Sequence, residues 1–233
     1  MPRQVKNRAY DASRRRAQAE DRKQRVLAAA SDLFVEAGYA GTSMTEVARR
    51  AGVALDTVYA LVGRKPELLL AVHDLLLGEG AVDEHGDPVP AVQRAYVRRM
   101  RATEGAAAKL AVYAESLARV LPRTAPLLDA LREAGATDAR CREVWQHVED
   151  RRAANMRLLV ADLRSTGELR DDVGDDLAAD LVWSMNAASY FLALRRRGLS
   201  PEDYAALVRE VWTRTLLAGH ATTAREARGT ISP

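Results

Sequence analysis

The sequence predicts an all-α fold. Ala, Leu, Arg and Glu dominate the 233 residues, and these types favour helices. The chain has one isoleucine, Ile231, and no sustained alternation of β-branched or aromatic residues that would indicate a strand. Hydrophobic residues make up 48% of the chain and charged residues 29%, enough for a packed core with a solvated surface.

The N-terminal third predicts one long and two short helices. A long helix is expected from about Asp21 to Ala37, because an apolar face recurs at helical spacing. That face consists of Val26, Ala30, Leu33, Phe34 and Ala37. Gly38 follows as a stop. Residues 1–20 are expected to form a flexible basic arm.

The two short helices are expected to end near Ala51 and Val62. Ser43 and Glu46 have capping-box spacing at the start of the first one. Gly52 separates it from the second, expected over residues 55–62. Pro66 suits the first turn of a further helix, which is expected to run to about Leu77.

The rest of the chain predicts a loop over residues 78–90 and then a series of helices. Their expected ranges are 91–103, 106–121, 123–134, 137–166, 174–197 and 201–218, with breaks at Gly105, Pro122, Gly135, Gly167 and Gly198. Ser200 and Asp203 mark the clearest helix start. The predicted division of the chain is an N-terminal domain over 21–65, a helical body over 66–220 and a tail over 221–233.

Several classes of protein are disfavoured by composition. A single cysteine, Cys141, excludes an intramolecular disulfide framework, and the four histidines lie far apart in sequence. The longest uncharged stretch, residues 181–194, is too short for a transmembrane helix. We therefore expect a cytoplasmic protein with no metal, no cofactor, no membrane partner and no catalytic centre.

Charge is unevenly distributed along the chain. Residues 1–65 hold 13 basic and 7 acidic side chains, whereas residues 66–233 hold 22 and 25. A basic N-terminal third on an acidic body suggests a polyanion partner at one end, although a solvated basic tail would show the same pattern.

Residues 44–61 satisfy the positional demands of a helix-turn-helix. The first helix needs a small residue where it meets the second, and Ala48 stands there; the turn needs positive φ, and Gly52 stands there. Val53, Val58 and Leu61 are expected to face inward. A helix of this kind fits the major groove of DNA, about 12 Å wide.

These residues resemble the tetracycline-repressor-like (TetR-like) family of helix-turn-helix transcription regulators. The matching positions are Phe34, Gly38, Tyr39, Thr42, Ser43, Val47, Ala48, Ala51, Gly52, Val53, Thr57, Tyr59, Lys65 and Leu68. A weaker likeness covers residues 167–170, 178–183 and 197–204. The chain departs from the family pattern at Ala54, where a capping Ser is usual, and at Leu61–Val62, where His–Phe is usual.

The resemblance implies a set of DNA-contacting residues. Tyr59 and Lys65 are expected to touch phosphate, and Leu55 and Ala60 to offer apolar contact to a thymine methyl. Asp56 is expected either to accept from a cytosine amine or to cap its helix. The full expected set is Ser43, Thr45, Leu55, Asp56, Thr57, Tyr59, Ala60, Arg64 and Lys65, with Arg14, Arg15 and Arg16 from the arm.

The resemblance also implies an effector pocket and a homodimer interface in the body. The expected pocket residues are Tyr96, Met100, Tyr113, Trp145, Met156, Trp183, Asn186 and Tyr190. Asn186 is the residue most strongly expected to contact a ligand or a second subunit, because a buried amide needs a hydrogen-bond partner and either could supply one. The expected interface residues are Ala187, Leu194, Leu207, Val211 and Trp212.

The function that this implies is a homodimeric repressor released from a palindromic operator by a small molecule. Two alternatives stay open at this point. One is a DNA-binding regulator without a small-molecule effector, and the other is a helical enzyme that carries an incidental helix-turn-helix.

Overall fold

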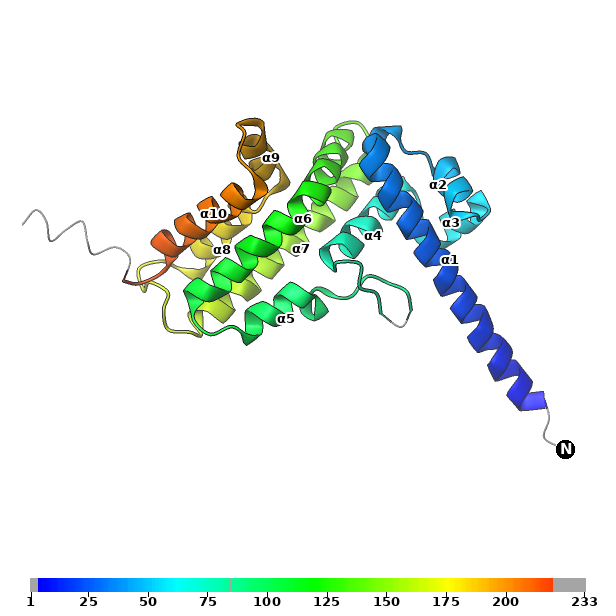
Figure 1. Ribbon diagram of the computed structural model, residues 1–233, viewed down its shortest axis with the longest axis horizontal. Coiled ribbons are helices and arrows are strands. Elements are labelled where there is room, and N and C mark those ends of the chain that lie inside the picture. Colours follow the sequence, from blue (N-terminus) through cyan, green and yellow to red (C-terminus); the bar gives the residue numbers. More distant parts are fainter. Residues whose placement is uncertain (1–3, 84, 220–233) are drawn as a thin grey trace, which may run out of the picture. The chain divides into compact units, whose positions relative to one another are not determined.

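The computed structural model describes residues 4–83 and 85–219, with side chains from Arg16 onward. Within these residues the regular elements are helices, as the sequence predicts, joined by loops that contain two isolated β-bridges (Figure 1). The helices are α1 (Gln4–Gly41), α2 (Met44–Ala51), α3 (Leu55–Val62), α4 (Lys65–Leu77), α5 (Ala95–Ala102), α6 (Ala106–Ala134), α7 (Ala139–Arg164), α8 (Asp175–Met185), α9 (Ala188–Arg196) and α10 (Pro201–Leu216), with a short 3-10 turn η1 (Ala91–Gln93).

The chain divides into two compact units. The first comprises Met1–Ala91 and Ala130–Trp145, and the second comprises Val92–Asp129 and Gln146–Pro233. The boundary expected at residue 65 falls inside the first unit, because α4 packs against α1 and α3. The predicted tail, residues 221–233, lies outside the described residues.

The core of the first unit forms where α1 packs against α2, α3 and α4. Val26, Ala30, Leu33 and Phe34 of the predicted apolar face are buried. Ala37 is exposed, so the prediction is wrong there, because the helix is about to end. Gly38 interrupts α1 with φ of 69°, which confirms the predicted break, although helical backbone already begins at Gln4 and covers most of the expected arm.

The predicted capping box of α2 is half formed. The Ser43 hydroxyl accepts a hydrogen bond from the Glu46 backbone N–H at 3.1 Å. The Glu46 carboxylate instead accepts two bonds from the Arg49 guanidinium, at 2.8 and 2.6 Å. At the other end, Gly52 adopts the left-handed conformation that the turn requires, with φ of 66° and ψ of 40°.

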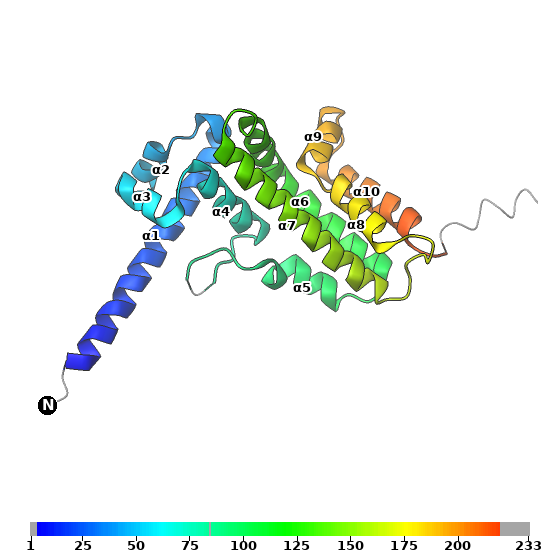
Figure 2. The same ribbon diagram turned by 180° about the vertical axis from the view of Figure 1, so that it is seen from behind.

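In the second unit, α6 and α7 run alongside each other, as the opposite views in Figures 1 and 2 both show. The predicted break at Pro122 is wrong, because α6 continues through Pro122 and Pro126. Burial of Leu121 and Ala125 offsets the loss of backbone donors there. The single helix predicted over 174–197 is also wrong. It is divided into α8 and α9 at Asn186, which is buried and forms the C-cap of α8.

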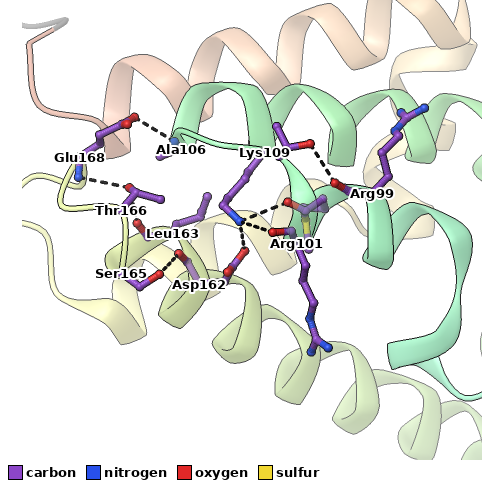
Figure 3. Close-up of polar contacts among 11 residues, drawn as sticks. Arg99, Arg101, Ala106, Lys109, Asp162, Leu163, Ser165, Thr166 and Glu168 are labelled. Carbon is purple, nitrogen blue, oxygen red and sulfur yellow. Dashed lines mark hydrogen bonds and ion pairs between the residues drawn. The ribbon is translucent and has the colours of Figure 1, made fainter.

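A buried lysine fixes the α5–α6 corner of the second unit (Figure 3). The Lys109 ammonium donates to the carbonyls of Met100 and Arg101, at 3.2 and 3.4 Å, and to Asp162 at 2.8 Å. The Glu168 carboxylate accepts from the Ala106 N–H at 2.8 Å, at the start of α6. A carboxylate at a helix N-terminus is favourable because the backbone dipoles point toward it.

No single helix among the described residues is long and apolar enough to cross a membrane. Helices α8 and α9 together meet the length and composition requirement, but they are bent by 48° where they join.

Candidate nucleic-acid interface

Helix α3 turns one face into the core and the other to solvent. Val58 is fully buried between the helices, as predicted, whereas Val53 and Leu61 are half-buried. Asp56, Tyr59 and Ala60 are exposed, and Tyr59 is 44% exposed, a high fraction for an aromatic side chain. The exposed side therefore offers a hydroxyl-bearing ring and a small apolar residue at the surface of a short helix.

The remaining residues expected on this helix are only partly exposed. Leu55 and Thr57 are half-buried. Ala54 is the N-cap and makes no side-chain hydrogen bond to the first turn. The loss of the usual hydroxyl cap is therefore not compensated at that residue.

The start of α2 presents small hydroxyl groups to solvent. Ser43 and Thr45 are both exposed. Farther along, Arg49 pairs with Glu46, and Arg50 pairs with Glu36 at 2.8 Å. These ion pairs lower the pKa of each carboxyl and raise that of each guanidinium.

Lys65, at the start of α4, lies over an aromatic ring. Its Nζ is 4.4 Å from the centroid of the Tyr39 ring and donates to the Ala40 carbonyl at 3.4 Å. Partial burial lowers the pKa of the ammonium below its ordinary value. Sequence reasoning missed this role of Tyr39, because no local spacing links residues 39 and 65.

Neighbouring contacts hold the same corner of the first unit. The Glu67 carboxylate accepts from the Arg64 backbone N–H at 3.0 Å and from the Arg140 side chain. The Tyr39 hydroxyl lies 3.3 Å from the Cys141 sulfur, and both residues are buried. Arg64 itself is exposed. The first turn of α4 thus joins Arg64 and Lys65 to fixed partners beside α3.

Only one residue of the expected basic run is described. Arg16 is exposed on α1, whereas the side chains of Arg14 and Arg15 lie outside the described residues. The part that these two play in binding stays a prediction.

Most of the residues expected to line an effector pocket lie in the second unit. Met100, Tyr113, Met156 and Asn186 are buried, and Tyr96, Trp183 and Tyr190 are half-buried around them. The Asn186 amide donates to the Tyr113 hydroxyl at 2.6 Å and to the Met156 sulfur at 3.1 Å. The chain itself therefore supplies partners for this amide.

Sequence reasoning missed Arg152, which donates to the side-chain oxygen of Asn186 and lies beside Trp183. The sequence signal that could have found Arg152 is its spacing from Met156, which lies one helical turn later on α7. Trp145 belongs to the first unit and is not part of this group.

The residues expected at a dimer interface differ in exposure. Ala187, Leu194, Leu207 and Val211 are half-buried in the single chain. Trp212 is fully buried, and its ring stacks on Tyr113 at 5.8 Å. Its assignment to a subunit surface is therefore corrected, because a ring enclosed by its own chain has no area left to offer a partner.

A surface groove of about 410 Å³ lies between α6 and α10. Alanines line it together with Glu115, Arg119, Glu202 and Arg209. The residues expected to line an effector pocket are not among its walls.

Comparison with known proteins agrees with the geometry of the first unit. Residues 26–72 match the family model described as "Bacterial regulatory proteins, tetR family". That segment includes the buried part of α1, both short helices and most of α4.

The fold matches solved structures of regulators at low sequence identity. One is a putative TetR-family regulator from Rhodococcus sp., with a TM-score of 0.61 at 16% identity, covering 82% of this chain and 96% of that one. A second is a putative regulator from Saccharomonospora viridis in complex with choline, with a TM-score of 0.62 at 15% identity, covering 84% of this chain and 97% of that one. A third is FadR from Bacillus subtilis in complex with stearoyl-CoA, with a TM-score of 0.60 at 16% identity, covering 81% of this chain and 96% of that one.

The family model and the surface of α3 agree on one function. The matched segment is a domain that binds DNA, and its second short helix turns an exposed face to solvent. The alternative of a helical enzyme with an incidental helix-turn-helix is set aside, since the family is one of regulators. Residues 26–72 of the chain match the TetR family of bacterial regulatory proteins, and the chain shares the fold of solved regulators of that family.

Proposed function

We propose that this regulator is a homodimeric repressor that leaves a palindromic operator when a small molecule binds its second unit. The observation that carries the proposal is the exposed face of α3 beside Lys65, which is held over the Tyr39 ring at the start of α4. That arrangement supports a base-reading surface on α3 with phosphate contacts at the start of α4. Two regulators similar in fold are complexes with choline and with stearoyl-CoA, which supports a small-molecule effector.

The proposed contacts follow from side-chain chemistry. Tyr59, Ser43, Thr45 and Thr57 donate hydroxyl hydrogen bonds to phosphate, and Arg64 and Lys65 add charge. Leu55 and Ala60 meet thymine methyl groups in the major groove, and Asp56 accepts from a cytosine amine. Arg14, Arg15 and Arg16 add attraction along the backbone.

A dimer follows from the limits of one short helix. A good contact to a base is worth about 1–3 kcal/mol, so a single α3 discriminates weakly among sequences. Two copies related by a two-fold axis double the contacts and read a palindrome. The interface proposed for the dimer uses the half-buried residues Ala187, Leu194, Leu207 and Val211.

We also propose a cytoplasmic location, because the proposed function is exerted on DNA.

The mechanism is a population shift. An effector that binds one arrangement of the second unit better than another changes the spacing of the two α3 helices. Coupling of this kind is reciprocal, so operator DNA must weaken effector binding by the same factor. Equal effector affinity with and without operator DNA contradicts the mechanism.

The first experiment measures binding to the DNA upstream of the protein's own gene, against excess random DNA and over a series of salt concentrations. Wild type is expected to resist the competitor, and Tyr59→Ala with Lys65→Gln to lose binding. Arg157→Gln is the matched control, because it removes one positive charge from an exposed position on α7. Equal binding by the Tyr59/Lys65 variant and the control contradicts the assigned interface.

Operator selection from random sequences, with sedimentation of the complex, tests the palindrome and the dimer. Two inverted half-sites bound by two subunits are expected. A single half-site bound by one subunit contradicts the dimer.

A further inference from the structure

We propose that the effector site in the second unit is built from hydrogen-bond donors and selects an aromatic carboxylate over a quaternary ammonium ion. The site is the donor cluster, defined as Trp183, Arg152, Asn186, Tyr113 and Trp212. The inference rests on the proposed function, because it names the chemical class of that effector.

The five side chains form one continuous chain of contacts. Arg152 donates to the Trp183 carbonyl at 2.8 Å and to the Asn186 side-chain oxygen. The Asn186 amide donates to the Tyr113 hydroxyl at 2.6 Å. The Tyr113 ring in turn stacks on Trp212, with centroids 5.8 Å apart. Helices α6, α7, α8 and α10 therefore all contribute to the cluster.

Donors outnumber good acceptors in this cluster. The indole Nε1–H groups of Trp183 and Trp212 are both buried, and neither has an acceptor among the described residues. The Tyr113 hydroxyl donates to the Met156 thioether at 3.4 Å, and a thioether sulfur is a weak acceptor. Buried polar groups are normally paired. A ligand that completes these bonds must carry acceptor oxygens.

The Tyr113 hydroxyl keeps its proton throughout the working range of pH. Burial is the largest cause that raises the pKa of this phenol above its ordinary value. Tyr113 therefore remains a donor as well as the acceptor for Asn186.

The charge of the cluster opposes a cationic ligand. The Arg152 guanidinium lies over the Trp183 ring, 5.4 Å from its centroid, and so occupies a face that a quaternary ammonium ion would use. Glu149, three residues before Arg152 on α7, is already paired with it and leaves no uncompensated negative charge there. A ligand carboxylate would accept the guanidinium bonds that the Trp183 carbonyl and the Asn186 side chain now accept.

Aromatic rings surround the donors. Tyr96 lies 6.4 Å from Tyr113, and Phe191 packs edge-on against Tyr204 at 5.1 Å. Both pairs belong to the buried cluster of the second unit or pack against it. Rings in this arrangement suit a flat apolar body attached to the carboxylate.

The position of the cluster gives a ligand a route to regulation. Asn186 ends α8, and the chain then bends by 48° into α9. A ligand that takes over the bonds between Arg152 and Asn186 therefore acts on the junction between the two helices. Ala187 lies at that junction, and Leu194 lies in α9, which begins there. Both residues belong to the proposed dimer interface.

The test compares three probes of similar size on the full chain. They are benzoate, benzamide and benzyltrimethylammonium, measured by calorimetry and by the shift in melting temperature at matched ionic strength. Benzoate is expected to bind at least tenfold more tightly than benzamide, and the cation is expected not to bind.

Tryptophan variants test the donors one at a time. Trp183→Phe and Trp212→Phe keep a ring and remove one N–H, so both are expected to fold and to weaken benzoate binding three- to tenfold. Trp145→Phe is the matched control, because it is the remaining tryptophan of the three and lies in the first unit. Its affinity for benzoate is expected to equal that of wild type.

Three results would overturn the inference. They are tighter binding of the cation than of benzoate, no binding of benzoate at millimolar concentration, and equal loss of affinity in all three tryptophan variants.

Operator binding in the presence of each probe separates this inference from the proposed function. Release of DNA by the cation alone supports effector control but overturns the ligand class. Benzoate that binds through the two indoles and leaves operator affinity unchanged supports the site and contradicts effector control.

Discussion

The ammonium of Lys109 lies 2.8 Å from the carboxylate of Asp162, with the lysine side chain almost fully buried (Figure 3). The same ammonium also holds the carbonyls of Met100 and Arg101 at the end of α5. One cation thus joins α5, α6 and α7. Because its partners are a carboxylate and two helix-end carbonyls, removing it leaves the half-buried Asp162 carboxylate without its cation and takes a donor from both carbonyls.

Lys109→Met is therefore expected to destabilise the protein by about 3 kcal/mol, the range found when one partner of a buried ion pair is removed. Urea unfolding measures the loss. The double variant Lys109→Met with Asp162→Leu is expected to recover part of it, because no carboxylate is then left unpaired. Additive losses in the two single variants would show that the pair is not coupled.

Gly52 is expected to resist replacement because of its backbone alone. Its φ is 66°, and a Cβ there would meet no atom closer than the Arg25 side chain at 3.6 Å. Gly52→Ala should therefore cost about 1–2 kcal/mol from the left-handed conformation. Gly52→Asn should cost less, since asparagine tolerates this region, and thermal unfolding compares the two. An alanine variant as stable as wild type would mean that the turn has changed conformation.

DNA affinity is expected to fall at alkaline pH through Lys65. Burial lowers the pKa of its ammonium, so as pH rises the charge is lost before that of an ordinary lysine at 10.5. Affinity for phosphate should decline over that range in wild type. In Lys65→Arg the charge persists, so the decline should vanish. Affinity measured from pH 7 to 10 at constant ionic strength tests this, and parallel curves would place the titrating group elsewhere.

The start of α10 is expected to lose stability only in acid. Ser200 donates backbone and side-chain bonds to the Asp203 carboxylate, at 3.0 and 2.7 Å, and these lower the pKa of that carboxyl below 3.8. A carboxyl whose pKa is lower in the folded than in the unfolded protein stabilises the fold at pH values above its unfolded pKa. This stabilisation disappears as the pH falls through its folded pKa. The stability difference between wild type and Asp203→Asn should therefore be constant near neutrality and shrink below pH 3.8.

Ser200→Ala tests the reciprocal half of this cap. The Ser200 hydroxyl accepts from the Asp203 N–H at 3.0 Å, so its loss should cost about 1 kcal/mol at neutral pH. Thermal unfolding measures the change. Ser165→Ala is a suitable control, because that hydroxyl bonds a carbonyl near the end of α7 and caps no helix start. An equal loss in the control would mean that capping is not the cause.

The sequence by itself determined the parts of this protein that depend on local chemistry. The long helix, the turn at Gly52, the start of α4 at Lys65–Pro66 and the cap at Ser200 were all predicted, because each depends on residues a few positions apart. The inward position of Val58 followed from the same short-range geometry.

Tertiary structure decided what local preference does not control. Packing of Leu121 and Ala125 carries α6 through two prolines, and burial of Asn186 divides α8 from α9, against the sequence prediction in both cases. Contacts between Lys65 and Tyr39, between Lys109 and Asp162, and between Arg152 and Asn186 join residues 26, 53 and 34 positions apart. No periodicity in the sequence encodes such pairs, because they form only when separate helices pack together.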